Sequence, residues 1–196
     1  LCASGTSYRR LDVPGGTLQG VSYCATCDGA FYKDKTVAVI GGGDTALGDA
    51  MYLSRMAKKV YLVHRRQEFR ANQALQTAVQ QNAAIELVLD AVPTAVLGEK
   101  RVDHLELLQN GASKTLPVDG VFVAIGSIPN TDFLGDLCKL DESGYILADE
   151  NGVTTTPGVF AAGDVRTTPL RQVVTAVADG ANCVQSIEQY FRKGNG

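Results

Sequence analysis

The sequence has no long apolar run. Its longest uninterrupted stretches, such as residues 37–40 and 121–125, have the length of a β-strand, whereas a membrane-spanning helix needs about 18 or more consecutive apolar residues. A membrane-spanning role is therefore not expected. The 196 residues are 45% hydrophobic and 20% charged, which is the composition of a globular protein with a substantial core and argues against disorder.

An excess of charge of one sign is also missing. The chain carries 18 basic and 21 acidic residues, a net charge of −3, and a pI near 5.4. Because nucleic acids and anionic membranes attract strongly basic surfaces, neither partner is expected, and any anion site must be local. No segment repeats at a fixed period, so a solenoid or propeller is not indicated.

The five cysteines include only one close pair, unlike the disulfide frameworks of small secreted proteins. A reducing compartment, the cytoplasm, is therefore expected. Cys2, Cys138 and Cys183 have no neighbouring cysteine in the sequence and are predicted to be small buried apolar side chains. The first residue is Leu1 rather than Met, and residues 1–6 resemble the end of a strand rather than a signal peptide. We therefore expect the chain to begin inside a longer protein.

The apolar pattern predicts an α/β fold with a parallel sheet. Strands and helices alternate from residue 36, with strands at 36–40, 59–63 and 85–89 and helices at 45–57 and about 68–81. Residues 91–110 alternate weakly around a turn at 98–101, which predicts two antiparallel strands. A buried strand at 121–125 precedes an expected domain boundary near Gly126, and beyond it we expect a hairpin near 144–146, a strand at 159–162 and a helix over about 170–191.

A glycine turn joins the first predicted strand and helix. Gly41, Gly43 and Ala46 form the pattern G-x-G-x-x-A, with Asp44 and Thr45 at the start of the helix. The first glycine permits the tight turn, the second admits a pyrophosphate, and the small third residue lets helix and strand pack closely. The free N–H groups of the helix start then face phosphate oxygens, so this turn predicts a dinucleotide site.

The end of the second predicted strand indicates which dinucleotide is bound. An NAD site usually has an acidic residue there, but this chain has His64, Arg65 and Arg66, followed by Arg70. Guanidinium groups match phosphate oxygens in pairs and keep their charge, so this cluster favours the 2′-phosphate of NADPH. The alternative is an ordinary solvated run of charges.

Cys24 and Cys27 are separated by two residues, a spacing that can close a small disulfide ring and that beside a βαβ unit is typical of redox activity. The alternative is half of a zinc site. Four ligands would be needed, and the chain has only two histidines, His64 and His104, so no metal is predicted. Asp28 follows the second thiol and is a candidate proton donor and acceptor, or else a solvated carboxylate or helix cap.

A weaker signal lies near the C-terminal end. The stretch 158–164 is a strand ending in glycine and Asp164, which could accept a hydrogen bond from a ribityl or ribose hydroxyl. Arg171, Gln172 and Val173 stand at the start of the last predicted helix, where N–H groups could bind a flavin carbonyl, although a helix start needs no flavin to explain it.

Together these motifs resemble, in the same order and over essentially the whole chain, those of bacterial-type low-molecular-weight thioredoxin reductase. The resemblance rests on the strings CATCDG and HRRxxxRA, the glycine turn, and the segments 123–131 and 158–164. The related flavoprotein that reduces peroxiredoxin shares the cysteine spacing but generally lacks the double arginine. A further alternative is a nucleotide-binding module without turnover.

The resemblance implies an oxidoreductase with a three-layer, Rossmann-like NADPH domain at 7–126, inserted in an FAD domain. Only the end of the first FAD segment, 1–6, and the C-terminal segment, 127–196, are expected here, so the N-terminal FAD-binding part is expected to be missing. The implied cofactors are NADPH and FAD, the implied partner is thioredoxin, and the implied assembly is a cytoplasmic homodimer.

By the same resemblance, NADPH reduces FAD and FAD reduces the Cys24–Cys27 disulfide. Cys27 would face the flavin, Cys24 would attack the disulfide of thioredoxin, and Asp28 would serve as acid and base. One departure stands out, because Gly48 and Asp49 occupy the place of a common acidic pair. A glycine inside a helix costs about 1 kcal/mol relative to alanine.

Overall fold

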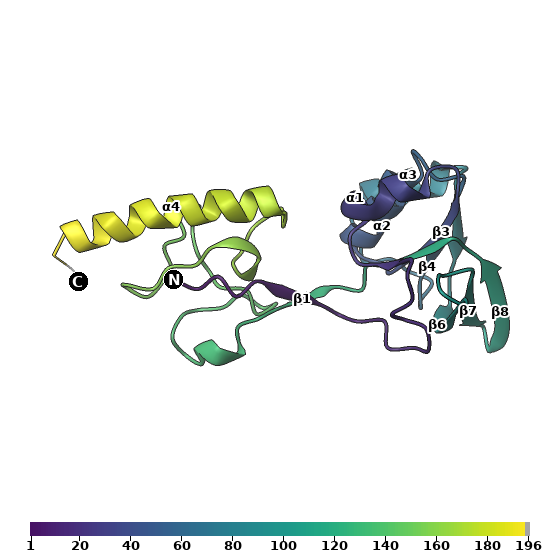
Figure 1. Cartoon of the computed structure of the whole chain (residues 1–196), viewed down its shortest axis with the longest axis horizontal. Coiled ribbons are helices and arrows are strands. Elements are labelled where there is room, and N and C mark those ends of the chain that lie inside the picture. The colour runs from purple at the N-terminus through teal and green to yellow at the C-terminus, as the bar shows by residue number, and fades with distance from the viewer. Residues whose placement is uncertain (195–196) are drawn as a thin grey trace. The chain divides into compact units, whose positions relative to one another are not determined.

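The computed structural model describes residues 1–194, which divide into two compact units (Figure 1). Unit 1 consists of Leu1–Tyr8 and the chain from Ser127 onward, and unit 2 is Arg9–Gly126. The first junction follows Tyr8, two residues beyond the junction expected from the sequence. The reason is that residues 6–8 form a strand that pairs with residues 127–129 of the same unit.

Unit 2 is built on a five-stranded parallel sheet in the order β2-β9-β3-β4-β5. Its buried strands are rich in β-branched residues, which suit a sheet covered on both faces. The predicted bounds of β3 and β4 are confirmed, and β5 ends one residue earlier than predicted. The strands are β2 (Val21–Ser22), β3 (Thr36–Ile40), β4 (Lys59–Val63), β5 (Ile85–Val88) and β9 (Gly120–Val123).

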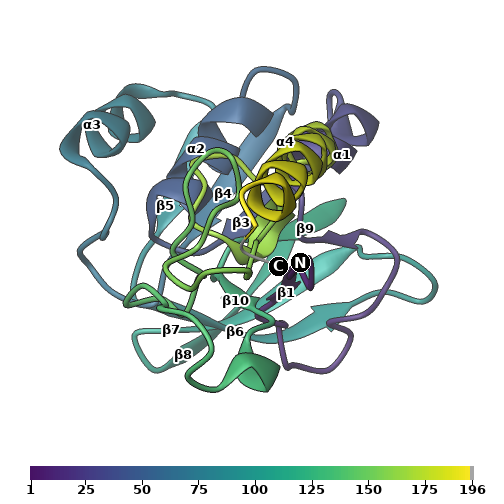
Figure 2. The ribbon, with the colours of Figure 1, turned by 90° about the vertical axis from the view of Figure 1, so that its left-hand side faces the viewer.

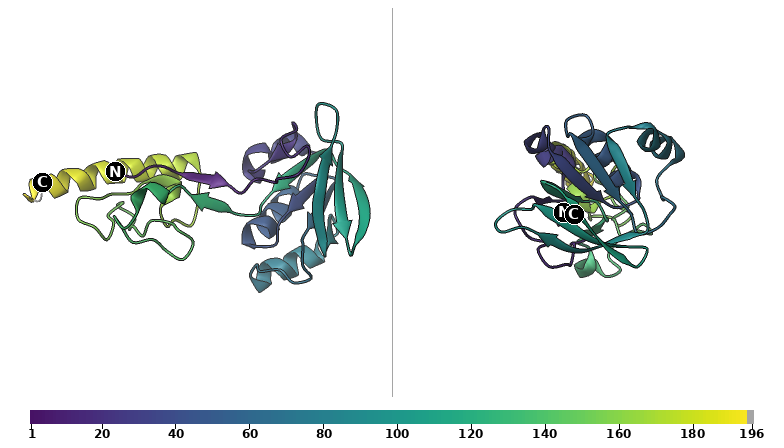
Figure 3. Two further views of the ribbon diagram at one scale, coloured as in Figure 1. Left: turned by 90° about the horizontal axis from the view of Figure 1, so that it is seen from below. Right: turned by 90° about the vertical axis from the view of Figure 1, so that its right-hand side faces the viewer.

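The two faces of this sheet are covered by different layers, as Figures 1 and 3 show. Val37 and Val39 pack against the helices, whereas Ala38 and Ile40 pack against a three-stranded antiparallel sheet. This period of two is what a strand dictates. The predicted three-layer arrangement is therefore confirmed, and its outer layers are α1 (Ala25–Asp28), η1 (Gly29–Tyr32), α2 (Asp44–Leu53) and α3 (Gln73–Gln81) on one side and β6 (Ala91–Leu97), β7 (His104–Gln109) and β8 (Ala112–Pro117) on the other.

Three sequence predictions in unit 2 are wrong. Helix α2 ends at Leu53 rather than residue 57, because a turn follows it. Helix α3 begins five residues later than expected, since the Asn72 side chain caps it by accepting a hydrogen bond from the Leu75 N–H at 3.0 Å. The antiparallel excursion has three strands rather than two, because β8 pairs with β7 along its whole length.

Unit 1 has little regular structure besides one long helix, α4 (Val173–Arg192), seen nearly end-on in Figure 2. Strand β1 (Thr6–Tyr8) pairs antiparallel with β10 (Ser127–Pro129), and two short 3-10 helices, η2 (Asp132–Leu134) and η3 (Gly163–Val165), follow. None of the helices within residues 1–194 has the length and apolarity needed to cross a bilayer.

Several predicted elements of unit 1 are shorter than expected. The hairpin near 144–146 is a single bridge between Leu140 and Ile146. The strand at 159–162 forms only isolated bridges, and it is bounded by Gly158 and Gly163, whose positive φ values of 77° and 76° turn the chain. Helix α4 begins at Val173 rather than residue 170, because a capping box at the preceding residue fixes its start.

Candidate functional site

The two close cysteines form a disulfide at the start of α1. Cys24 and Cys27 are joined with an S–S distance of 2.04 Å. Cys24 caps the helix, and its Sγ accepts a hydrogen bond from the Cys27 N–H at 3.2 Å. Cys27 is exposed and Cys24 is half-buried. A bonded pair cannot bind zinc as thiolates, and within residues 1–194 no group of three or more His, Cys, Asp and Glu side chains is arranged so that it could hold a metal ion.

Ser22 fixes the carboxylate that follows the disulfide. Its hydroxyl donates to Asp28 Oδ2 at 2.7 Å and accepts from the Cys24 N–H at 3.1 Å. The Asp28 N–H in turn donates to the Cys24 carbonyl at 3.1 Å. Ser22 is only 6% exposed and its partners Cys24 and Asp28 are half-buried, so this small network is partly shielded from water. Sequence reasoning missed Ser22, whose only signal is its place at the end of the strand that leads into the cysteine pair.

The glycine turn lies between β3 and α2 as predicted, and its geometry explains its small residues. A Cβ at Gly41 would lie 2.3 Å from the Ala124 carbonyl oxygen and 2.7 Å from the Ala46 Cβ. A Cβ at Gly43 would meet no atom within 4 Å, and no side chain caps the helix there. Open space therefore faces the N–H groups of the first turn of α2, where Asp44 and Thr45 are exposed. This geometry fits a phosphate group.

His64 lies beneath this turn. A Cβ at Gly42 would be 2.2 Å from the His64 ring, so only glycine leaves room for it. The ring Nε2 lies 3.2 Å from the Glu68 carbonyl oxygen, and the ring stacks on Phe69 with centroids 5.3 Å apart. Burial lowers the pKa of His64, and Arg65 among its basic neighbours lowers it further. His64 is thus placed as a neutral packing group against the turn rather than as a cation.

Arg65, Arg66 and Arg70 are all exposed, unlike His64. Among residues 1–194 none of the three arginines forms an ion pair. The Arg70 N–H donates to the Gly42 carbonyl at 2.8 Å, and this hydrogen bond connects the loop after β4 to the glycine turn. Three uncompensated guanidinium groups therefore belong to a loop that is fastened to the turn.

The disulfide and the glycine turn lie at the same end of the sheet, the end at which its parallel strands have their carboxyl termini. Strand β2 is parallel to β9, and β9 is parallel to β3. The disulfide follows the carboxyl end of β2 and the turn follows the carboxyl end of β3, and ligands of open α/β sheets bind at this end.

The residues predicted to contact a flavin lie in unit 1. Asp164 is half-buried in η3, and its carbonyl accepts a hydrogen bond from Arg171 Nε at 3.3 Å. The Arg171 guanidinium carbon lies 4.0 Å from the centroid of the Tyr145 ring. The Gln172 N–H donates to Thr175 Oγ1 at 3.1 Å, so the cap already uses that donor.

The start of α4 nevertheless leaves donors for a ligand. The first-turn N–H groups of a helix have no acceptor within the helix, and Val173, the first residue of α4, is 82% exposed. Of the four residues that sequence reasoning chose, Asp164 and Arg171 are in direct contact, and Val173 lies two positions beyond Arg171.

A buried ion pair that sequence reasoning missed holds the turn around Asp164. Arg166 Nε and Nη2 donate to the two oxygens of Asp179 at 2.7 and 2.6 Å, and the Gly163 N–H donates to Asp179 Oδ2 at 2.9 Å. Hydrogen bonding to Arg166 lowers the pKa of Asp179. The pair links the end of η3 to α4. Its two residues are 13 positions apart, and no local sequence pattern predicts that they pair.

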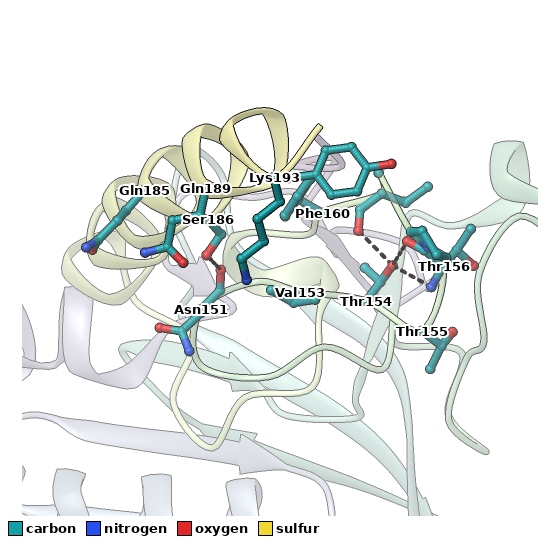
Figure 4. A pocket seen from close by; sticks show the side chains of 14 residues that line it. Asn151, Val153, Thr154, Thr155, Thr156, Phe160, Gln185, Ser186, Gln189 and Lys193 are labelled. Atoms are coloured by element: carbon teal, nitrogen blue, oxygen red, sulfur yellow. Dashed lines mark hydrogen bonds between the residues drawn. The ribbon is translucent and has the colours of Figure 1, made fainter. Parts of the chain in front are cut away.

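Unit 1 also contains a cavity of about 490 Å³ (Figure 4). Its lining combines apolar residues such as Val153 and Phe160 with polar ones that include Asn151, Thr154, Ser186 and Lys193. None of the residues predicted to act in the site lines it. The Ser186 hydroxyl donates to the Asn151 carbonyl at 2.9 Å, so at least one of these groups serves the fold.

Comparison with known proteins gives the family. Residues 1–180 match the family model of pyridine nucleotide-disulphide oxidoreductases. The chain belongs to this family. It is 41% identical over 199 residues to the thioredoxin reductase of Listeria innocua, covering 98% of this chain and 62% of that protein. The thioredoxin reductase of Peptoclostridium acidaminophilum is 41% identical over 201 residues, covering 97% of this chain and 64% of that protein.

Solved structures agree. The crystal structure of thioredoxin reductase from Streptococcus pyogenes superposes with a TM-score of 0.89 at 40% identity, covering 97% of this chain and 64% of that one. The enzyme from Giardia duodenalis gives a TM-score of 0.90 at 36% identity, with the same coverage. The resemblance drawn from the motifs is confirmed. The chain spans less than two thirds of the length of these relatives.

Proposed function

We propose that the protein carrying this chain is a thioredoxin reductase that uses NADPH and FAD and passes reducing equivalents through Cys24 and Cys27 to thioredoxin. The observation that carries the proposal is that a disulfide and a glycine turn both follow the carboxyl ends of strands in one parallel sheet. Family membership and the names of the relatives support both cofactors and the partner. The cytoplasmic location and the homodimer rest on the sequence resemblance.

The residues present fit both cofactors. The turn at Gly41 and Gly43 would hold the pyrophosphate of NADPH, and Arg65, Arg66 and Arg70 would bind its 2′-phosphate. In unit 1, Asp164 and the free N–H groups at the start of α4 would hold FAD. When bound, the flavin supplies a relay that accepts a hydride and delivers two electrons to a disulfide.

The chain's own residues perform the exchange with the protein substrate. In the reduced pair, the Cys24 thiolate attacks the thioredoxin disulfide and forms a mixed disulfide, and Cys27 then attacks Cys24 and releases reduced thioredoxin. The Cys27 N–H that points at Cys24 Sγ favours the thiolate at that position. Asp28, held by Ser22, gives and takes the proton. Phe31, 72% exposed just after α1, offers an apolar contact to a protein partner.

The exposures of the two cysteine residues make this assignment testable. Cys27 is the more exposed residue of the pair, although the family resemblance gives the attack on thioredoxin to Cys24. We expect Cys27→Ser to accumulate a mixed disulfide between Cys24 and thioredoxin, since no resolving thiol remains, and to lose NADPH-dependent reduction of thioredoxin. Mass spectrometry of the trapped species identifies the linked cysteine.

The matched control is Cys24→Ser. If this variant traps thioredoxin while Cys27→Ser does not, the two roles are reversed. If neither variant traps thioredoxin but one traps the disulfide of a peroxiredoxin-reducing partner, the related flavoprotein reductase is the better assignment.

Nucleotide choice is tested by binding. The double variant Arg65→Ala, Arg66→Ala should lose its preference for NADPH over NADH by roughly ten-fold or more, because two charge-assisted contacts to the 2′-phosphate disappear. The matched control is Arg55→Ala, an exposed arginine beyond the opposite end of α2. An unchanged NADPH-to-NADH ratio in the double variant would mean that these arginines only face solvent.

A further inference from the structure

Unit 1 brings two of the three remaining cysteines to one apolar cluster. Cys138 is buried in a cluster with Ile146, Ala161 and two other residues, and Cys2 packs against the same cluster. None of the activity proposed above requires either thiol. Cys2 is half-buried, so it has contact with solvent, whereas Cys138 is 6% exposed.

The backbone determines which way Cys2 points. The Cys2 N–H donates to the Phe160 carbonyl at 2.7 Å, and the Cys2 carbonyl accepts from the Ala162 N–H at 2.9 Å, so Cys2 stands opposite Ala161 in a parallel bridge. Side chains paired in a bridge project to the same face, and neighbours along the strand project to the other. Ala161 faces the Cys138 cluster, so Cys2 faces it too.

The third free cysteine lies on the opposite face. Phe160 and Ala162, the neighbours of Ala161, form a separate cluster with Cys183. The strand therefore separates Cys183 from Cys2, and Cys183 serves as an internal control.

A second constraint places Cys138 beside the same strand. The residues on either side of it are tied to the chain just before that strand: Thr156 Oγ1 donates to the Leu137 carbonyl at 2.7 Å, and the Lys139 N–H donates to Thr155 Oγ1 at 3.3 Å. Burial raises the pKa of the Cys138 thiol, and the Cys2 thiol, which packs against the same cluster, raises it further.

We propose that Cys2 and Cys138 are a second oxidisable thiol pair, distinct from Cys24 and Cys27, that closes to a disulfide in response to peroxide. Cys2, the accessible thiol, reacts first: its sulfur takes one peroxide oxygen to become a sulfenic acid, and one water leaves. Cys138 then attacks the Cys2 sulfur, the S–S bond forms, and a second water leaves. Two thiols are oxidised and one peroxide is reduced to two waters.

The bond would covalently join the segment Leu1–Tyr8 to the rest of unit 1. That segment is also held by β1 pairing with β10, by the bridge at Cys2 and by hydrogen bonds to Asn130. A crosslink over so long a stretch of chain restricts the unfolded state strongly, so oxidation should raise the stability of unit 1.

The test uses the whole chain carrying Cys24→Ser and Cys27→Ser, which leaves three cysteines. The protein is reduced with a dithiol, freed of it, treated with hydrogen peroxide, alkylated and digested with trypsin. We expect three free thiols to fall to one, and the tryptic peptide of residues 1–9 to be linked to that of residues 115–139. The peptide containing Cys183 should stay alkylated.

Two further variants complete the test. Cys138→Ser should abolish the linked peptide, whereas Cys183→Ser should retain it together with a higher melting temperature of the oxidised form. The proposal is overturned if Cys2 and Cys138 remain separately alkylated, if Cys2 is oxidised without a crosslink, or if Cys2 is linked to Cys183. None of these outcomes bears on the reduction of thioredoxin by the other pair.

Discussion

The two units of the chain are held together by different means. Unit 2 has two apolar clusters of fourteen buried residues each, one on either face of its parallel sheet. Unit 1 has clusters of five and three buried residues. In α4, only Asp179 and Cys183 of twenty residues are buried, and one of them is charged.

This difference shows how a small core is supplemented. Burying apolar surface stabilises by about 25 cal/mol per Å², so the two large apolar clusters on the faces of the sheet contribute strongly to the stability of unit 2. Within this chain, unit 1 buries fewer apolar residues and also contains a buried, hydrogen-bonded ion pair. Unit 2 should therefore tolerate the loss of a polar contact, whereas unit 1 should not.

The largest expected effect comes from breaking that ion pair. Asp179→Ala should lower the free energy of unfolding of unit 1 by about 3–5 kcal/mol, because it leaves the buried Arg166 charge without its partner. Hydrogen exchange measured peptide by peptide should show lost protection in α4 and around Gly163, with unit 2 unchanged.

The control lies on the same helix. Glu188 pairs with Arg192 at 3.3 Å on the exposed side of α4. Glu188→Ala should change stability by no more than about 0.5 kcal/mol, since exposed pairs one turn apart contribute little. An equal loss of protection in both units after Asp179→Ala would contradict the idea that the ion pair belongs to unit 1 alone.

The next largest effect concerns the carboxyl group of Asp49, which is partly buried beside apolar residues of unit 2. Asp49 lies on α2 three residues after Ala46 and four before Leu53, both buried, and burial raises its pKa to about 6. A carboxyl with a raised pKa favours the fold while protonated and loses that contribution as the pH rises through about 6.

Asp49→Asn should therefore stabilise unit 2 well above pH 6 and make little difference below the ordinary carboxyl pKa of 3.8. The gain at high pH should be at most on the order of 3 kcal/mol, since the pKa rises by about two units and each unit corresponds to about 1.4 kcal/mol. Urea unfolding at both ends of this range measures it. The exposed Asp12 provides the control, and a gain of the same size from Asp12→Asn would point to net charge instead of burial.

The contrast between the units also explains what could be predicted from the sequence. In unit 2 the apolar runs gave β3 and β4 with their bounds, and the glycine turn gave the start of α2 to within one residue. Such signals are local: a run of β-branched residues or a G-x-G-x-x-A string carries its meaning within a few positions. The weak, polar pattern of β8 contains no such local signal. This strand forms because its backbone pairs with β7.

In unit 1 and in the site, the missed features depend on side-chain contacts that no local sequence pattern specifies, between residues six or more positions apart. The sequence around Asp179 does not predict its ion pair with Arg166, and the sequence around Ser22 does not predict its hydrogen bond to Asp28. His64 was grouped with the arginines by adjacency, yet the structure separates it, because the residue at the end of β4 points into the turn while those after it point to solvent. Tertiary packing decided each of these cases.

The smallest effect compares the two units through one glycine in each. Gly48 in α2 and Gly180 in α4 are both inside helices, and a Cβ added to either would meet no atom within 4 Å. Alanine there restricts the unfolded chain and favours the helix, so Gly48→Ala and Gly180→Ala should each stabilise by about 0.5–1 kcal/mol. Gly42→Ala, whose Cβ would lie 2.2 Å from the His64 ring, should instead destabilise. Hydrogen exchange should show increased protection of unit 2 in Gly48→Ala and of unit 1 in Gly180→Ala. A gain shared by both units would show that they unfold together, and the contrast between their cores would then not be a contrast in stability.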